Sequence, residues 1–358
     1  MFFPLKRKAA MAQQSWSRPA VAWVFRMLLG FLQRIRARSM DARILPVALM
    51  FLLLWLAATG PMPAAAAQTR VPAPQQLAPG VYAVVNQNVE PTPENHGAVG
   101  NQGILIGDNG VILVDTGTSV RYAAELIATV RQLTSKPIVL VINTHQHPAF
   151  IFGNGALALQ GVPILAHRAA AELIGQRCEK CLKNLNQILG ADEMLGTQVV
   201  VPTRIIDGPI SLRVAGRRLD IVHYGHSSSP GAIGVIDRAS GVLFAGGLVS
   251  IDRVPDTRDA RIGTWQRALE VLKKSKVRLM VPGEGPVAPT TRIDELERYL
   301  AALQSAVEKT YQQGVSLGDA GARSEVPEFR HLPAYYPAHN RNVEQLYLQL
   351  EQASFNKE

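Results

Sequence analysis

Three histidines have the spacing and surroundings of a metal-binding set. His145 and His147 follow the continuous apolar run 137–142 and lie two residues apart. In an extended backbone such residues point to the same side, so two imidazoles can bind one ion. His226 lies in the loop 224–231, between two stretches typical of strands. Three imidazoles and a water form a known catalytic zinc site, in which zinc lowers the pKa of its bound water to about 7.

Two cysteines form a second candidate site. Cys178 and Cys181 are separated by two residues in a polar segment, 172–189, that has the composition of a helix. In an oxidising compartment a local disulfide is the expected state of such a pair. Two free thiols, or a pair with a metal-binding or redox role, are the alternatives, although two thiolates fall short of the four ligands usual for zinc.

Other catalytic motifs are excluded by their context. The segment 225–229 contains Gly, His and Ser, but it lacks the second glycine of a nucleophile elbow and lies between two strands. The glycines of 100–107 do not form the dinucleotide-binding pattern.

The net charge of the chain belongs to its first residues. The 358 residues include 37 Lys and Arg and 28 Asp and Glu. Residues 1–66 hold nine of the basic and one of the acidic residues, a net charge of +8. The remainder holds 28 basic and 27 acidic residues, a net charge of +1. A nucleic-acid partner is therefore not expected, because it would require a basic patch on the folded part.

The first 67 residues have the features of an export leader. Basic residues precede the apolar run 44–58, and an Ala-rich stretch ends near Gln68. This order is typical of a secretory signal, and the apolar run is short for a membrane span of about 20 residues. We therefore expect a periplasmic or secreted protein that contacts the membrane only through the leader. The alternative is an inner-membrane anchor at 44–60.

The elements that must position these residues alternate in kind. Short β-type runs dominate 81–114, and a helix is expected over 119–133, ahead of the buried run 137–142. The second half repeats the order, with strand-like runs over 210–245 and helices over 264–276, 293–313 and 341–352. This pattern favours two sheets face to face with helices outside, a layered α/β fold.

The ordered set of motifs resembles the metallo-β-lactamase superfamily. The segments that carry the resemblance occur in the family's order and are 101–106, 114–117, 144–154, 225–227, 243–247 and 281–286. The resemblance implies an αββα sandwich and zinc bound by His145, His147 and His226. It also implies that Asp115 supports the metal loop, although a hydrogen-bonded turn residue is an equally good interpretation. More narrowly, the leader, the Cys178–Leu182 segment with Gly196-Thr197, and a terminal helix near 339–343 resemble periplasmic zinc metallohydrolases of quinoprotein systems.

The chain departs from the family's two-metal motif at four positions. Ala149 and Phe150 stand where the motif His-x-His-x-Asp-His has its Asp and last His. Gly247 replaces a bridging Asp, and Glu284 replaces a late His. We therefore expect one zinc ion, with Glu284 as a candidate replacement base. Hydrolysis is expected to be slow, because general acid–base catalysis is typically worth about 10²–10⁴-fold.

These interpretations lead to two functions of different classes. The first is a zinc-dependent hydrolase with a single three-histidine site, acting on a small ester, thioester or lactam-like bond. The alternative is an inactive binding protein of a periplasmic quinoprotein oxidation system, with a small-molecule ligand or a protein partner. The expected organisation is a leader over 1–67, a linker over 68–79, the sandwich over 80–290 and a helical extension over 291–358 that packs on it.

Overall fold

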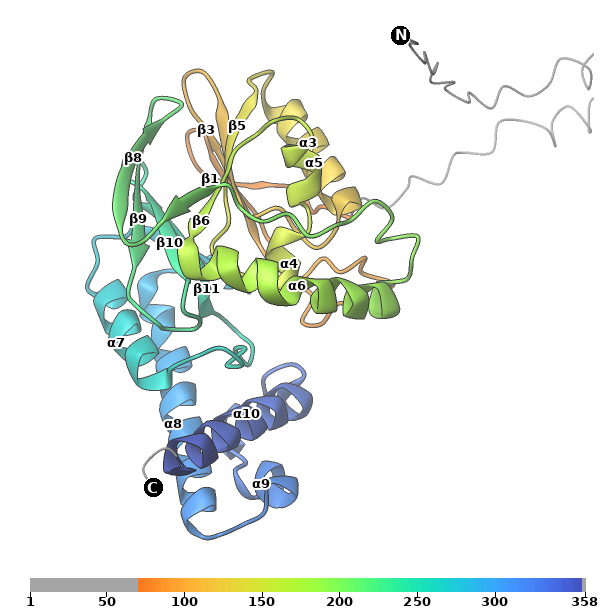
Figure 1. Ribbon diagram of the computed structural model, residues 1–358. Helices are drawn as coiled ribbons and strands as arrows, with labels where there is room; N and C mark the ends of the chain where they lie inside the picture. The colour runs from red at the N-terminus through yellow and green to blue at the C-terminus, as the bar shows by residue number, and fades with distance from the viewer. Residues whose placement is uncertain (1–69, 356–358) are drawn as a thin grey trace, which may run out of the picture. The chain divides into compact units, whose positions relative to one another are not determined.

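The computed structural model describes residues 70–355, and the leader predicted over 1–67 lies outside the described residues. A seven-stranded sheet has the order β1 (Gln75–Ala78), β2 (Val81–Val84), β3 (Gln102–Ile106), β4 (Val111–Val114), β5 (Ile138–Ile142), β6 (Ile164–His167) and β7 (Arg204–Ile206). A five-stranded sheet has the order β12 (Leu279–Glu284), β11 (Val242–Ser250), β10 (Ile233–Asp237), β9 (Arg217–His223) and β8 (Ile210–Val214). Figure 1 shows both sheets and the helices around them.

Eight α-helices are described along this part of the chain. They are α3 (Val120–Leu133), α4 (Pro148–Ile151), α5 (Asn154–Ala158), α6 (Arg168–Leu189), α7 (Ile262–Lys273), α8 (Ile293–Gln312), α9 (Leu317–Arg323) and α10 (Tyr335–Phe355). Helix α3 begins as its sequence predicts, because the Ser119 hydroxyl accepts a hydrogen bond from the Tyr122 N–H at 3.0 Å.

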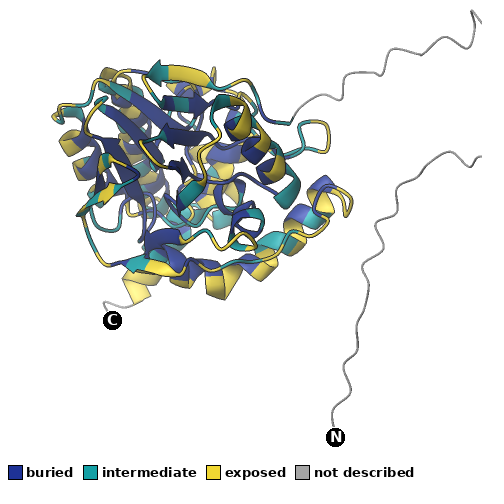
Figure 2. Cartoon of the chain, turned by 90° about the horizontal axis from the view of Figure 1, so that it is seen from above, coloured by how far each residue is buried: buried dark blue, intermediate teal, exposed yellow. Residues whose placement is uncertain are grey.

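Alternation along the strands produces the layers. In β4, Ile112 and Val114 join the apolar cluster between the two sheets, whereas Val111 and Leu113 join the cluster beneath α3. Successive strand residues point to opposite faces, so a strand buried on both sides is apolar throughout. Figure 2 shows buried sheets inside helices that expose their outer faces. This arrangement is the four-layer αββα sandwich predicted from the sequence.

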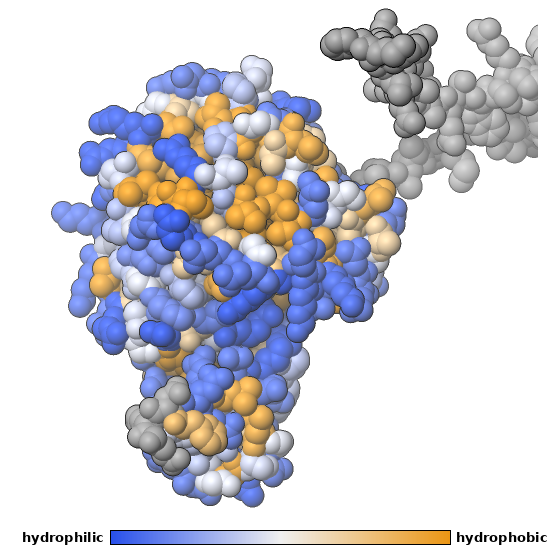
Figure 3. Space-filling view, viewed as in Figure 1, coloured by the Kyte–Doolittle hydropathy of each residue, from blue (hydrophilic) through white to orange (hydrophobic). Residues whose placement is uncertain are grey.

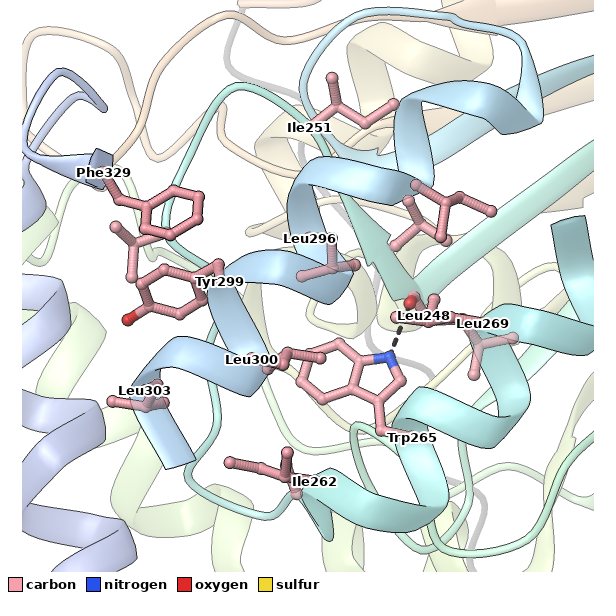
Figure 4. Close-up of a cluster of buried hydrophobic side chains, with 14 of the residues drawn as sticks. Leu248, Ile251, Ile262, Trp265, Leu269, Leu296, Tyr299, Leu300, Leu303 and Phe329 are labelled. Atoms are coloured by element: carbon pink, nitrogen blue, oxygen red, sulfur yellow. Dashed lines mark hydrogen bonds between the residues drawn. The ribbon is translucent and has the colours of Figure 1, made fainter. Parts of the chain in front are cut away.

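The outer face of the five-stranded sheet forms a third cluster with the C-terminal helices. Trp265 of α7 is 1% exposed and donates a hydrogen bond from Nε1 to the Leu248 carbonyl at 2.8 Å (Figure 4). Leu296 and Leu300 of α8 pack in the same cluster, as do Tyr335 and Val343 of α10. The helices after residue 290 thus share a core with the sheet.

The segment expected as a linker differs from that expectation. Residues 75–78 form β1, which pairs antiparallel with β2 at the edge of the larger sheet. The Pro- and Gln-rich composition disguised this strand. The prolines of this segment, at 72, 74 and 79, lie outside the strand, which pairs its backbone on one side alone.

The surface is predominantly polar on the face seen in Figure 3, with apolar side chains gathered toward the upper half of the view. Among the residues that the structure describes, the most exposed large apolar side chain is that of Leu159, at 82%. Within residues 70–355, none of the helices combines the length and the apolar character that crossing a bilayer requires.

Candidate functional site

A cleft of about 900 Å³ lies where the ends of strands from both sheets meet helix α6. The loop after β5 contributes His145 and His147, and the end of β12 contributes Glu284. The loop between β11 and α7 contributes Asp256, Arg258 and Asp259 as further lining residues. The structure therefore brings two of the three predicted histidines, and the predicted base, to one cavity.

Asp115 holds the histidine loop from beneath. It is 2% exposed and adopts φ of +62° directly after β4. Its carboxyl group shares hydrogen bonds with the backbone N–H and the hydroxyl of Thr144, at 2.8 and 2.7 Å. The Thr144 hydroxyl in turn lies 2.9 Å from His145 Nδ1. Burial raises the pKa of Asp115 to about 8, while its hydrogen bonds with Thr144 oppose this rise.

The two cleft histidines are neutral at pH 7. Burial lowers the pKa of His145 to about 3, with a further contribution from the nearby His147. Burial also lowers the pKa of His147 to about 4, although the carboxylate of Asp256, 3.8 Å from its Nε2, opposes this shift. His147 Nδ1 accepts a hydrogen bond from the Ala149 N–H at 3.4 Å, so its proton is on Nε2, toward the cleft.

Apolar and small residues occupy the positions beside these histidines. The Phe150 ring lies 4.4 Å from the His145 ring and 5.8 Å from the His147 ring, measured between centroids. At Gly247, an added Cβ would lie 2.7 Å from His145 Cδ2 and 2.9 Å from its Nε2. A larger side chain at Gly247 would therefore displace the His145 ring.

His226, the third predicted zinc ligand, does not line the cleft. Its Nε2 donates a hydrogen bond to the Asp259 carbonyl at 2.6 Å, so this nitrogen carries a proton and is not free to bind a metal. Ser228 and Ser229 line the cleft in its place. Their hydroxyls have no hydrogen-bond partner among the described residues. The sequence did not point to these serines, because the candidates were chosen as residue types that commonly bind zinc. A run of three serines has no pattern that indicates a binding site.

Three of the four carboxylates that line the cleft have an arginine partner, and Glu179 of α6 is the fourth. Glu284 is 3.3 Å from Arg253, Asp256 is 2.8 Å from Arg258, and Asp259 is 2.6 Å from Arg177. These pairs balance the negative charge that a divalent cation would otherwise neutralise.

The pKa values of two of these carboxylates diverge. Burial raises the pKa of Glu284 to about 7, although Arg253 opposes this rise. Burial acts in the same direction on Asp256, but the hydrogen bonds and charge of Arg258 outweigh it and lower that pKa to about 2. Of these two groups, Glu284 is thus the one that can exchange a proton at neutral pH.

The residues of this cleft do not fit the zinc centre that the sequence predicted. The part of the chain that the structure describes contains no group of three or more His, Cys, Asp or Glu side chains placed to hold a metal ion. Two imidazoles converge on the cleft, but His226 is turned away, and Glu284 is held by Arg253. A catalytic zinc site usually has three protein ligands.

Cys178 and Cys181 also line the cleft, from helix α6. The structure holds them as free thiols, not as the disulfide expected from the sequence. Cys178 Sγ contacts the Gln146 carbonyl at 3.9 Å, and Cys181 Sγ contacts the Arg177 carbonyl at 3.5 Å. Cys181 therefore finds its partner within α6, whereas Cys178 reaches the loop after β5.

A second, smaller cavity adjoins the cleft. It measures about 260 Å³ and shares His147, Asp256 and Glu284 with the cleft. Its other lining includes the apolar residues Val89, Val99, Leu185, Ile188, Val254 and Ala338, beside the polar Glu90, Thr118, Arg253, Arg341 and Asn342. The cleft thus continues into a smaller cavity, and the part lined by these apolar side chains is called its apolar extension.

Comparison with known proteins agrees with this architecture. The family model of the metallo-beta-lactamase superfamily matches residues 97–284, more than half of the chain. The chain belongs to the metallo-beta-lactamase superfamily. Members of this superfamily are generally hydrolases that bind zinc, so the donor set described above is a departure within the family.

The relatives of known activity are distant. A linear primary-alkylsulfatase of Pseudomonas sp. (strain ATCC 19151) is 23% identical over an alignment of 267 residues, which covers 64% of this chain and 50% of the alkylsulfatase. The chain thus spans about half the length of this relative.

Two solved structures show the shared fold. A metallo-beta-lactamase from Pontibacter korlensis has a TM-score of 0.53 at 20% identity, covering 64% of this chain and 98% of its own. A stereoselective inverting sec-alkylsulfatase from Pseudomonas sp. has a TM-score of 0.59 at 18% identity, covering 77% of this chain and 50% of its own.

Proposed function

We propose that this chain is a ligand-binding member of the superfamily, whose cleft holds a small amphiphilic molecule without zinc-dependent hydrolysis. The observation that carries the proposal is the donor set of the cleft. Two neutral imidazoles line the cleft together with two serines and three glycines, and three of its four carboxylates are each paired with an arginine. Such a set offers hydrogen bonds to a polar organic group.

The shape of the cleft supports an amphiphile. A polar head group would lie beside the His147 Nε2–H and the Arg258 guanidinium, both of which line the larger and the smaller cavity. An alkyl chain would then enter the apolar extension between Val99, Leu185 and Val254. The distant alkylsulfatase relative acts, by its name, on molecules of this kind.

Hydrolysis without a metal is the second candidate, and Glu284 is the observation that favours it. Its raised pKa, about 7, suits a general base that takes a proton from water at neutral pH. The same carboxyl group lies 3.3 Å from Arg253, which would hold its orientation.

Octyl sulfate, with 1-octanol as the uncharged comparison, separates these functions. We expect calorimetry to show binding of octyl sulfate that weakens about tenfold in His147→Ala, the effect of losing one hydrogen bond to a charged group. Leu159→Ala, on the surface, is the matched control and should bind as the parent does. The bound octyl sulfate should be recovered intact.

Two results would count against this proposal. Release of sulfate that is lost in Glu284→Gln would establish the hydrolase instead. Equal binding of octyl sulfate by the parent and His147→Ala, or no binding at all, would contradict an amphiphilic ligand in this cleft.

We also propose that the protein works outside the cytoplasm. This rests on the composition of residues 1–67 alone. Mass spectrometry of the protein from fractionated cells should find a mature N-terminus near residue 68 in the periplasm. A chain that retains residues 44–60 in the membrane fraction would support the anchor.

A further inference from the structure

Helix α6 turns both of its cysteines toward the cleft. Cys178 and Cys181 are three residues apart, so they lie one above the other on one face of the helix. At this spacing the Cβ atoms are about 5–6 Å apart, and a modest adjustment of the helix brings them to the roughly 3.5–4.5 Å of a disulfide. They are the only two cysteines of the chain.

The two thiols differ in access. Cys178 is 1% exposed and packs among Ile174, Leu185 and other apolar side chains beneath α6. Cys181 is partly exposed and lines both the cleft and its apolar extension. An outer thiol backed by an inner one is the arrangement of an attacking and a resolving cysteine.

We propose that Cys178 and Cys181 form a dithiol–disulfide exchange site that takes a low-molecular-weight disulfide from the cleft. Nothing in the ligand-binding function requires this chemistry, and the proposal does not depend on it. A small disulfide fits because Cys181 opens into a cavity of about 900 Å³.

The charge around the outer thiol suits this role. The adjacent Cys178 thiol and Arg258 lower the pKa of Cys181, while burial opposes them. The adjacent Cys181 and burial raise the pKa of Cys178. Of the two, Cys181 is thus the one that ionises more readily, and the thiolate is the form that attacks a disulfide.

The reaction proceeds in two exchanges. The Cys181 thiolate attacks one sulfur of the small disulfide, forms a mixed disulfide and releases the first small thiolate, which takes up a proton. Cys178 then loses its proton, attacks Cys181 Sγ and releases the second small thiolate. Two protein thiols are oxidised to one disulfide, and one small disulfide is reduced to two thiols.

Intact-protein mass spectrometry with bis(2-hydroxyethyl) disulfide tests the proposal on the full chain. The parent should lose two hydrogens and keep no adduct. Cys178→Ser should gain one mercaptoethanol group, at Cys181, and Cys181→Ser should react at least about tenfold more slowly, because its remaining thiol is buried. Cys181→Ser should react readily once unfolded in urea.

The contrary outcomes are equally distinct. Equal rates for the two variants, or a parent that stops at the mixed disulfide, would overturn the assignment. Circular dichroism establishes that each variant is folded. If a variant does not fold, alkylation of the folded parent with iodoacetamide replaces it. Cys181 should be labelled faster than Cys178, and equal labelling rates for the two thiols would contradict the proposal. Octyl sulfate binding is measured separately, so either proposal can fail without the other.

Discussion

At the residue scale, the cleft is built around buried groups whose protonation differs from that in water. Asp115 is the clearest case, since it lies beneath the histidine loop and its pKa is raised to about 8 by burial. At neutral pH it is mostly protonated, and the neutral acid shares two hydrogen bonds with Thr144. A neutral amide should replace it with little loss. Asparagine also tolerates the positive φ of this position.

Asp115→Asn should therefore change how stability depends on pH. The folded pKa of Asp115 lies above the unfolded value of about 3.9, so the folded protein holds a proton that the unfolded chain releases. This stabilisation is complete below the unfolded pKa and is lost as pH rises through about 8. Between pH 6 and 8.5, the parent should lose about 2 kcal/mol more free energy of unfolding than the variant.

Urea unfolding at the two pH values measures this difference. Glu284 also has a raised pKa, but it is present in both proteins and cancels in the comparison. Parallel losses in the parent and the variant would show that Asp115 is ionised in the folded state.

At the element scale, β11 and the loop after β5 approach so closely that only glycine fits between them. An added Cβ at Gly247 would meet the His145 ring, and one at Gly246 would lie 2.2 Å from Thr144 Cβ. The strand and the loop thus fix each other, and the histidines stand on a rigid support. The close contact also explains why an acidic ligand at Gly247 cannot be restored without moving His145.

Gly247→Ala should destabilise the protein by about 1–3 kcal/mol, the usual cost of overpacking a core. Gly208→Ala is the matched control, because no atom lies within 4 Å of its added Cβ. Thermal unfolding of both variants provides the comparison. Equal melting temperatures for the two would mean that β11 and the histidine loop have room between them.

At the scale of the whole molecule, the C-terminal helices position the cleft. Asn342 of α10 donates a hydrogen bond to the Pro255 carbonyl at 2.8 Å and accepts one from the Thr257 N–H at 3.2 Å. The loop that these bonds hold includes Asp256 and Arg258, two lining residues of the cleft. The extension is therefore part of the site as well as part of the core.

Asn342→Ala should free this loop. Buried backbone groups would lose their partners, at a cost of about 1–3 kcal/mol each. Hydrogen exchange over residues 253–259 should accelerate in the variant, while exchange in the central strands β4 and β5 accelerates only as far as the global loss of stability requires. Unchanged exchange over 253–259 would show that the loop does not depend on α10.

The sequence predicts the layers of this molecule better than its site. The helical periodicity of α3 and the continuous apolar run of β5 are visible in the local sequence, and the bounds of both elements were expected to within a few residues. The strand β1 was hidden by its composition, because its pairing with β2 is a tertiary contact. For the site, the loop after β5 could be predicted from His-x-His at a strand end.

The third ligand could not be predicted in this way. Which residue of 224–231 faces the cleft depends on how that loop turns, and the structure turns Ser228 inward and His226 toward the Asp259 carbonyl. The pairing of each carboxylate with an arginine joins residues up to 82 positions apart, as Arg177 and Asp259 are. The sequence around either residue does not predict such a long-range contact.

Zinc per chain, measured after equilibration with zinc chloride and desalting, shows whether this cleft has a zinc centre. We expect well below one zinc per chain in the parent, unchanged in His226→Ala, and a gain in Ser228→His, which adds a third imidazole to the cleft wall. About one zinc per chain in the parent, lost in His145→Ala and in His226→Ala, would contradict this expectation and restore the three-histidine hydrolase.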